Sequence, residues 1–281
     1  WCTNTSSAGT YDIVPSAATG GTFTASNYSI TYANGTLTVN PKALTVTAND
    51  GSATYGTAFS VGAGSSAFTS SGLENSETIG SITIASDDGA TNTSSAGTYD
   101  IVPSAATGGT FTASNYSITY ANGTLTVNPK ALTVTANDGS ATYGTAFSVG
   151  AGSSAFTSSG LENSETIGSI TIASDDGATN TSSAGTYDIV PSAATGGTFT
   201  ASNYSITYAN GTLTVNPKAL TVTANDGSAT YGTAFSVGAG SSAFTSSGLE
   251  NSETIGSITI ASDDGATNTS SAGTYDIVPS A

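Results

Sequence analysis

The chain repeats one 88-residue unit without a single substitution. Residues Lys42–Pro129 return letter for letter as Lys130–Pro217, and the same unit begins again at Lys218. A protein that copies a module in tandem uses it for length or for valency, and each copy packs against itself and its neighbours. The fold of the chain is therefore predicted to be the fold of one unit, repeated.

The repeat divides the chain into four segments. Residues 3–41 match 91–129, whereas Trp1 and Cys2 lie outside the repeat pattern. The segments are the C-terminal part of a repeat, two complete repeats and the N-terminal part of a further repeat, at residues 1–41, 42–129, 130–217 and 218–281.

Composition restricts the class of protein. Nineteen carboxylates against three lysines give a net charge of −16, which disfavours nucleic acid and anionic membranes as partners. Only 8% of residues are charged, too few for a charge-driven disordered chain. A single cysteine excludes a disulfide framework within the repeats. No apolar run approaches the roughly 20 residues that span a bilayer, and no charged and apolar leader opens the chain, so we expect no membrane insertion in this segment and any targeting signal to lie outside it.

The end of each repeat has the pattern of a β-hairpin. Residues 116–127 alternate apolar and polar side chains on both sides of Asn122-Gly123, a pair that favours a type I′ turn. A turn there would place Tyr120 opposite Leu125 and Ile118 opposite Val127 on one face, with Thr119 opposite Thr126 on the other.

The rest of the unit also alternates with the period of strands. Inward-facing residues are predicted in 43–48 (Leu44, Val46), 81–85 (Ile82, Ile84) and 98–101 (Tyr99, Ile101), with weaker strand signals at 55–61 and 67–69. Only 72–79 looks helical, because Ser71 and Glu74 have capping-box spacing, and a single turn is the most it indicates. The predicted class is all-β, with about seven short strands per unit and at most one short helical turn.

Consecutive units are joined without a flexible linker. Pro129 stiffens the connection between the last strand of one unit and the first strand of the next, and Asn128 before it favours extended geometry. Parallel, adjacent first and last strands would place the two ends of each unit on opposite sides. The expectation is a linear array of stiffly connected modules.

Several segments of the unit resemble one known family. They are Lys-Ala-Leu-Thr-Val-Thr-Ala at 42–48, Thr-Tyr-Gly at 54–56, Ser-Ser-Gly-Leu at 70–73, Ser-Ala-Gly-Thr-Tyr at 95–99 and the stretch at 113–127. Together they are similar to the MBG repeats, including the YGX type, which occur in tandem in large bacterial surface and secreted proteins, among them adhesins. The resemblance implies β-rich, β-grasp-like modules at an extracellular or cell-surface location, and it brings no catalytic residues.

Candidate sites are few. Asp87 and Asp88, and their copies Asp175 and Asp176, offer oxygen ligands for calcium near Asn92, although the spacing fits no EF-hand or glycine-rich calcium repeat and also suits a solvated turn. The other candidates are an acid pair for glycoside hydrolysis or a capped helix start (Glu74, Glu77), a lysine for a Lys-Asn crosslink (Lys42), and three glycosylation sequons (Asn92, Asn115, Asn122).

The unit lacks the parts of an enzyme. It has no His, no Arg and no cysteine, so the usual bases, nucleophile activators and anion clamps are missing. We therefore expect no catalysis and no cofactor other than the calcium hypothesis. The predicted function is structural, in a surface filament or adhesin stalk. The alternative is an adhesin module that binds glycans or cell surfaces through repeat avidity.

Two hypotheses concern the incomplete repeats at the ends. Residues 218–281 lack the closing strands that residues 18–41 contain. A longer chain would supply them by covalent continuation. Alternatively, identical chains would associate head to tail by strand complementation.

Overall fold

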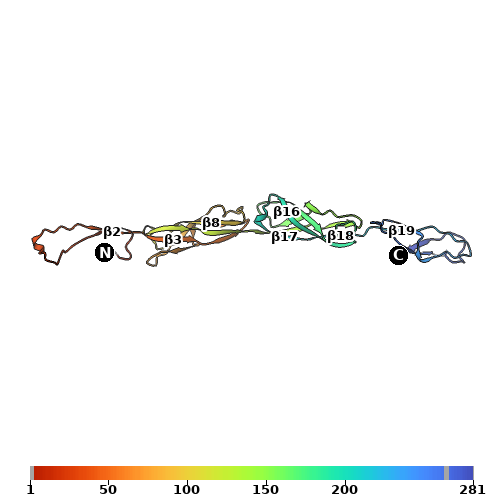
Figure 1. Ribbon diagram of the computed structural model, residues 1–281, viewed down its shortest axis with the longest axis horizontal. Helices are drawn as coiled ribbons and strands as arrows, with labels where there is room; N and C mark the ends of the chain where they lie inside the picture. The colour runs from red at the N-terminus through yellow and green to blue at the C-terminus, as the bar shows by residue number, and fades with distance from the viewer. Residues whose placement is uncertain (1–2, 263–265, 281) are drawn as a thin grey trace. The chain divides into compact units, whose positions relative to one another are not determined.

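A computed structural model describes residues 3–262 and 266–280 of the chain, and almost all of its regular structure is β (Figure 1). Among these described residues there is no α-helix, and the helical content consists of three 3-10 turns at η1 (Ala25–Asn27), η2 (Ala113–Asn115) and η3 (Ala201–Asn203). The predicted all-β class is confirmed.

Each complete repeat contains eight strands, close to the seven expected. In the first they are β3 (Lys42–Ala48), β4 (Gly51–Thr54), β5 (Gly62–Ser65), β6 (Phe68–Ser71), β7 (Ser81–Ser86), β8 (Gly97–Thr107), β9 (Tyr116–Ala121) and β10 (Gly123–Asn128). In the second they are β11 (Lys130–Ala136), β12 (Gly139–Thr142), β13 (Gly150–Ser153), β14 (Phe156–Ser159), β15 (Ile167–Ser174), β16 (Gly185–Gly197), β17 (Tyr204–Ala209) and β18 (Gly211–Asn216).

The strands of a repeat form two sheets. In the first complete repeat, one sheet has the order β6-β3-β9 and the other the order β4-β10-β8-β7-β5. The second complete repeat has the same arrangement, with β14-β11-β17 and β12-β18-β16-β15-β13. Identical sequence thus produces identical topology in both copies.

The first and last strands of a repeat are parallel neighbours in both sheets. β3 pairs in parallel with β9, and after the chain passes from one sheet to the other, β4 pairs in parallel with β10. The register stays constant across this change, because Lys42↔Tyr116 and Gly51↔Leu125 are both separated by 74 residues. The chain consequently enters a repeat at one end and leaves it at the other, as the sequence predicted.

The predicted hairpin around Asn122-Gly123 is wrong. β9 and β10 lie in different sheets and do not pair with each other, and neither Asn122 nor Gly123 has positive φ. Glycine is needed at 123 for space, because a Cβ there would lie 2.6 Å from the Ala48 carbonyl oxygen and 2.7 Å from that of Asn49. The Asn-Gly pair marks the place where the last strand changes sheets.

The predicted helical turn at 72–79 is also wrong. Asn75 and Ser76 have φ values of 52° and 59°, and the Glu77 N–H donates to the Glu74 carbonyl at 2.8 Å. Positive φ at both central residues is the requirement of a type I′ turn, so the tight turn of the unit lies here. The spacing of Ser71 and Glu74 that suggested a helix cap serves a turn after β6.

The core of each repeat comes from the alternating positions. Leu44, Val46, Ile82, Ile101 and Leu125 are all at most 1% exposed. Ile84 is buried and Tyr99 half-buried, so the inward faces predicted for these strands are largely correct. The weak strand signal at 55–61 is wrong, since β4 ends at Thr54 and β5 begins at Gly62.

The incomplete segments keep the local pairing of the complete repeats. Their strands are β1 (Gly9–Ile13), β2 (Gly35–Val39), β19 (Thr221–Ala224), β20 (Gly238–Ser241), β21 (Phe244–Ser247), β22 (Ile258–Ser262) and β23 (Ile277–Ser280). Gly9↔Val39 repeats the register of Gly97↔Val127. However, Ile13 is 53% exposed whereas its copy Ile101 is 1% exposed. Burial of the core therefore requires both sheets of a repeat.

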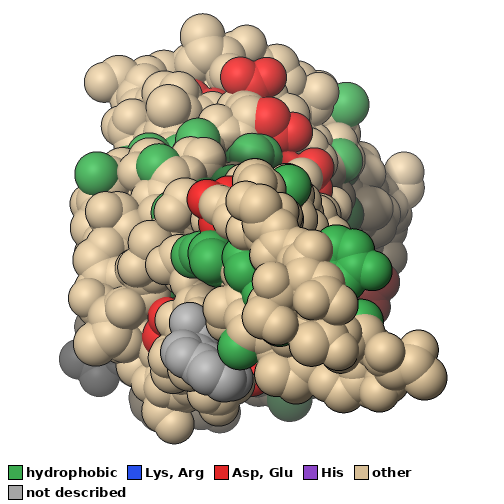
Figure 2. All heavy atoms as spheres, turned by 90° about the vertical axis from the view of Figure 1, so that its left-hand side faces the viewer, with side chains coloured by type: hydrophobic (Ala, Val, Ile, Leu, Met, Phe, Trp, Pro, Cys, Tyr) green, Lys and Arg blue, Asp and Glu red, His purple; other side chains and the backbone are tan. Residues whose placement is uncertain are grey.

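The surface is polar and sparsely charged. On the face shown in Figure 2, acidic side chains lie scattered among uncharged polar atoms and single apolar side chains. No helix within the described residues is both long and apolar enough to cross a bilayer.

Candidate functional site: the junction between repeats

The aspartates predicted as a calcium site lie in an exposed loop after β7. Asp87 and Asp88 are both exposed, and one carboxylate oxygen of Asp87 accepts a hydrogen bond from the Asp100 N–H at 3.2 Å. Asp175 and Asp176 occupy the same exposed positions in the second complete repeat. Within the described ranges, no three His, Cys, Asp or Glu side chains come together as a metal site would require. Calcium binding by these aspartates stays a prediction.

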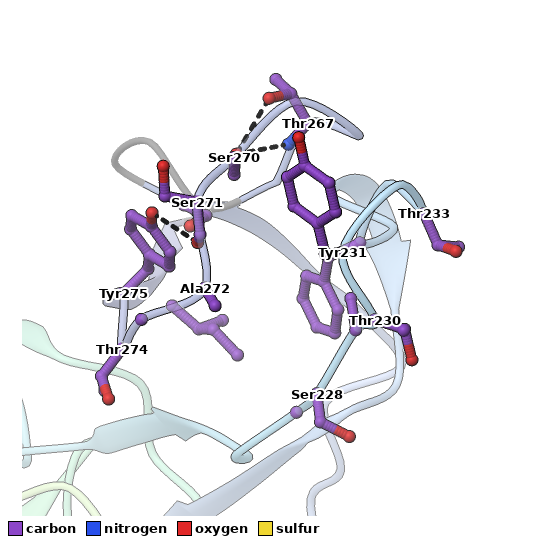
Figure 3. Close-up of a pocket in the computed structure, with 16 residues that line it drawn as sticks. Ser228, Thr230, Tyr231, Thr233, Thr267, Ser270, Ser271, Ala272, Thr274 and Tyr275 are labelled. Carbon is purple, nitrogen blue, oxygen red and sulfur yellow. Dashed lines mark hydrogen bonds between the residues drawn. The ribbon is translucent and has the colours of Figure 1, made fainter.

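One cavity of the structure is the groove of an incomplete repeat. It measures about 390 Å³ in residues 218–281, where Tyr231 lies on one wall and Ser271 and Tyr275 lie on the other (Figure 3). In the complete repeat, β18 runs between the counterparts of these walls, since it pairs with β12 on one side and β16 on the other. The groove is thus the place of the closing strand and gives no reason to assign a small-molecule ligand.

Each repeat presents an acidic turn at the end where its first strand begins, which we call the near end. In the second complete repeat this turn is 162–165, with Asn163 and Ser164 at positive φ and the Glu165 N–H donating to the Glu162 carbonyl at 2.9 Å. Lys130 forms an ion pair with Glu162. The Tyr204 hydroxyl accepts from the Glu162 N–H at 2.9 Å and donates to the Glu165 carboxylate. Both glutamates therefore fix a turn.

The opposite end of the preceding repeat, where its last strand finishes, is called the far end here. It contacts this turn through Tyr55. Its hydroxyl donates to Oε1 of Glu165 at 2.8 Å, while Tyr204 bonds the other oxygen of the same carboxylate. The rings of Tyr55 and Tyr204 meet edge to face at 5.4 Å, a geometry that favours aromatic pairs. Tyr55 is 4% exposed, whereas its copy Tyr231, which has no acidic turn packed against it in this structure, is 74% exposed. One carboxylate thus joins tyrosines of two repeats.

Asparagine side chains complete the junction. Asn92 and Asn163 exchange two hydrogen bonds of 3.2 Å, from the Asn92 amide to Oδ1 of Asn163 and from the Asn163 amide to the Asn92 carbonyl. Asn203, 3% exposed, accepts from the Ala96 N–H at 2.9 Å. Two of the three sequon positions, 92 and 203 (the copy of Asn115), are therefore occupied by contacts between repeats. A glycan on either would block the junction.

Parts of the same contact set recur at the other two boundaries between segments. Tyr143 donates to Glu253 at 2.6 Å, and Asn180 and Asn251 exchange bonds of 3.1 and 3.0 Å. Ala8 donates to Asn115 at 2.9 Å. The chain forms two compact units, and the first, which extends to Ala131, also includes Gly160–Glu165 and Thr200–Ser205 of the second complete repeat. Each junction therefore lies inside a compact unit.

A second cavity follows from this pattern. It measures about 140 Å³ and is lined by Glu74, Glu77 and Tyr116 together with residues of the first segment. These three residues are the copies of Glu162, Glu165 and Tyr204, against which Tyr55 packs at the next junction. The copy of Tyr55 would precede residue 1 in the sequence. The acid pair Glu74 and Glu77 thus belongs to a junction surface.

Comparison with known proteins identifies the repeat. The family profile of the MBG domain (YGX type) matches residues 44–126 and again 132–214, more than half of the chain. The chain belongs to the MBG domain family of the YGX type. No curated protein and no solved structure shows significant similarity to the chain.

Membership agrees with the resemblance seen in the sequence and identifies each MBG repeat as a repeat module of the kind found in surface proteins. Tyr55-Gly56-Thr57 has the Tyr-Gly-X form of the type, and its first two residues lie at the junction. A Cβ at Gly56, where φ is 89°, would lie 2.4 Å from Cγ of Glu162. Sequence reasoning placed Tyr99 and Tyr120 on inward faces, predicted no contact for Tyr55, and so missed the junction. The signal available in the sequence was the Tyr-Gly pair, which directly follows the short strand β4.

The junction tyrosines of the MBG repeats have raised pKa values. Burial, the hydrogen bond to Glu77 and the charge of that carboxylate raise the pKa of Tyr116 to about 12 from its ordinary 10.0. Burial also raises the pKa of Tyr204, with further contributions from Glu165 and from Tyr55. Both hydroxyls are therefore kept protonated as donors.

We expect the chain to lose stability in alkali through these two tyrosines. Because their folded-state pKa values lie above 10.0, their contribution is complete below pH 10 and is lost as the pH rises through about 12. Urea unfolding at a series of pH values should show this fall in the free energy of unfolding. The double variant Tyr116→Phe with Tyr204→Phe should fall less over the same window. An equal fall in the variant would exclude these hydroxyls as the cause.

Proposed function

We propose that the MBG repeats form or extend an extracellular filament or adhesin stalk on a bacterial surface. The observation that carries the proposal is the junction. Every complete repeat has a near end with the acidic turn and a far end with the Tyr-Gly pair, and the two fit each other in consecutive copies. A module that exists to be joined to its own copies adds length.

The covalent connection supports the same role. β10 ends at Asn128 and β11 begins at Lys130, so Pro129 alone separates strands of consecutive repeats. A glycine- or serine-rich linker would behave as a flexible coil whose span grows with the square root of its length. One proline between two paired strands, together with the junction contacts, restricts that freedom.

The proposal is tested by varying the number of repeats. Chains with two, four and eight complete repeats, displayed on a bacterial surface with a terminal tag, should place the tag at distances from the membrane that increase by a constant step. Electron tomography of the labelled tag measures this distance. A distance independent of repeat number would overturn the stalk.

A junction variant provides the matched comparison. Tyr55→Ala with the same change at Tyr143 removes the ring and hydroxyl that contact the next repeat, so the distance should fall below the linear series. Val61→Ala with Val149→Ala is the control, because both valines are 45% exposed and lie away from the junction contacts. The same chains, applied to glycans and host cells, test the adhesin alternative. Binding that rises with repeat number would favour an adhesin module, and a stalk should bind neither.

A further inference from the structure

The parallel first and last strands carry a mechanical consequence. Tension along the chain enters a repeat before Lys42 and leaves it after Asn128, at opposite ends of strands that are neighbours. Such tension slides the two strands along each other and strains all of their hydrogen bonds together. Antiparallel terminal strands would instead separate one bond at a time. The topology therefore places the repeat in the more resistant geometry.

The pairing that resists this sliding spans both sheets. It runs from Lys42↔Tyr116 to Thr47↔Ala121 in one sheet and from Gly51↔Leu125 to Thr54↔Asn128 in the other. Two further bonds extend its end, from the Tyr55 N–H to the Asn128 carbonyl at 2.9 Å and from the Asn128 amide to the Ala53 carbonyl at 3.3 Å. We call this set of pairs the shear clamp.

Asp50 bridges the break between the two halves of the shear clamp. Where the strands change sheets, residues 49 and 50 lie in no strand, and the ladder is interrupted. Oδ1 of Asp50 accepts a hydrogen bond from the Thr124 N–H at 2.7 Å, in the same 74-residue register as the ladders. Asp138 makes the identical 2.7 Å bond to Thr212 in the second complete repeat. A side chain thus replaces the missing rung with a charged acceptor.

We propose that each repeat is a force-resisting module in which the shear clamp sets the unfolding force and Asp50 and Asp138 are positioning residues of that clamp. This inference goes beyond the proposed stalk, because a spacer needs length alone. It concerns forced unfolding, whose rate is governed by the barrier and not by equilibrium stability. Bonds inside the clamp should therefore control the rate, and equally stabilising contacts elsewhere should not.

Single-molecule pulling on the 281-residue chain, held by its two ends, tests the proposal. Each complete repeat should unfold in one step that releases roughly 300 Å of chain less its folded length. In Asp50→Ala with Asp138→Ala, the forced unfolding rate should rise about tenfold, since a hydrogen bond to a charged group is lost. Asp50→Asn with Asp138→Asn keeps the oxygen acceptor, so its forced unfolding rate should stay close to that of the wild type.

The control lies outside the clamp. Ile84→Val with Ile172→Val affects buried residues of β7 and β15, which pair with neither terminal strand. It should lower stability in urea and leave the forced rate nearly unchanged. A forced rate that follows urea stability equally in both variants would overturn the clamp. Alanine variants that unfold under force no faster than the wild type would remove Asp50 from it.

A milder variant covers the case in which Asp50→Ala does not fold. Asn128→Ala with Asn216→Ala removes one exposed bond at the end of the clamp and should raise the forced rate by a smaller factor. No change in that rate, or extension of the wild-type repeats without distinct steps, would contradict the proposal. Neither result depends on where the chain resides, so the surface-display test of the stalk remains separate.

Discussion

Alanine at Gly123 and Gly211 should destabilise both complete repeats by about 3 kcal/mol or more each, because the added methyl group meets backbone that cannot move aside. At Gly123 the new Cβ would lie 2.6 Å from the Ala48 carbonyl oxygen, and at Gly211 it would lie 2.6 Å from that of Ala136. The clash falls where the last strand crosses between sheets. Urea unfolding followed by circular dichroism measures the loss.

A second pair of glycines provides the control for this substitution. A Cβ at Gly97 or Gly185 meets only a tyrosine ring carbon at 3.9 Å, and neither glycine has positive φ. Alanine there should change the free energy of unfolding by no more than about 0.5 kcal/mol. If the two pairs lost stability equally, the crowded crossing would not be the cause, because the unfolded-chain effect of replacing glycine by alanine acts in the opposite, stabilising direction.

Truncation of Leu125 and Leu213 to alanine should cost about 2 to 5 kcal/mol in each repeat. Both leucines are 0% exposed, and each lies in the second strand of the larger sheet, where Leu125 is opposite Tyr99 in β8 and Gly51 in β4. Loss of the side chain leaves a cavity between the sheets. The same urea unfolding, with thermal unfolding as a second measurement, determines the cost.

Two substitutions calibrate that result. Leucine to isoleucine at both positions keeps the volume and should cost less than about 1.5 kcal/mol. Thr124→Ala with Thr212→Ala changes neighbouring exposed side chains and should be nearly neutral, because their bonds to aspartate come from the backbone N–H. A neutral leucine variant would mean that the two sheets do not enclose a common core.

The sequence predicted the inward and outward faces of single strands better than it predicted which strands pair. Alternation placed Leu44, Val46, Ile82 and Ile101 inward correctly, because the period of a strand depends only on the residues within it. It could not show which strands pair. Asn122-Gly123 has the residues of a hairpin turn, yet the same pair also permits an extended crossing between sheets, and tertiary contacts decide between these outcomes.

The junction was beyond sequence patterns for a related reason. Tyr55 and Glu165 are 110 residues apart, and each also fits a local interpretation, as a core aromatic or a turn acid. Only the placement of one repeat's end against the next brings them together. The exact repetition did indicate that such complementarity was available, since every copy carries both halves of any contact between neighbours.

The complementary ends also determine how the protein can change in size. Both halves of the junction are encoded within a single 88-residue unit, which carries the Tyr-Gly pair near its start, then the acidic turn at 74–77, and then Asn92. Deleting or duplicating a whole unit therefore leaves every remaining boundary with the same partners. The number of repeats can therefore change by whole units in one genetic event without any compensating mutation at the remaining boundaries.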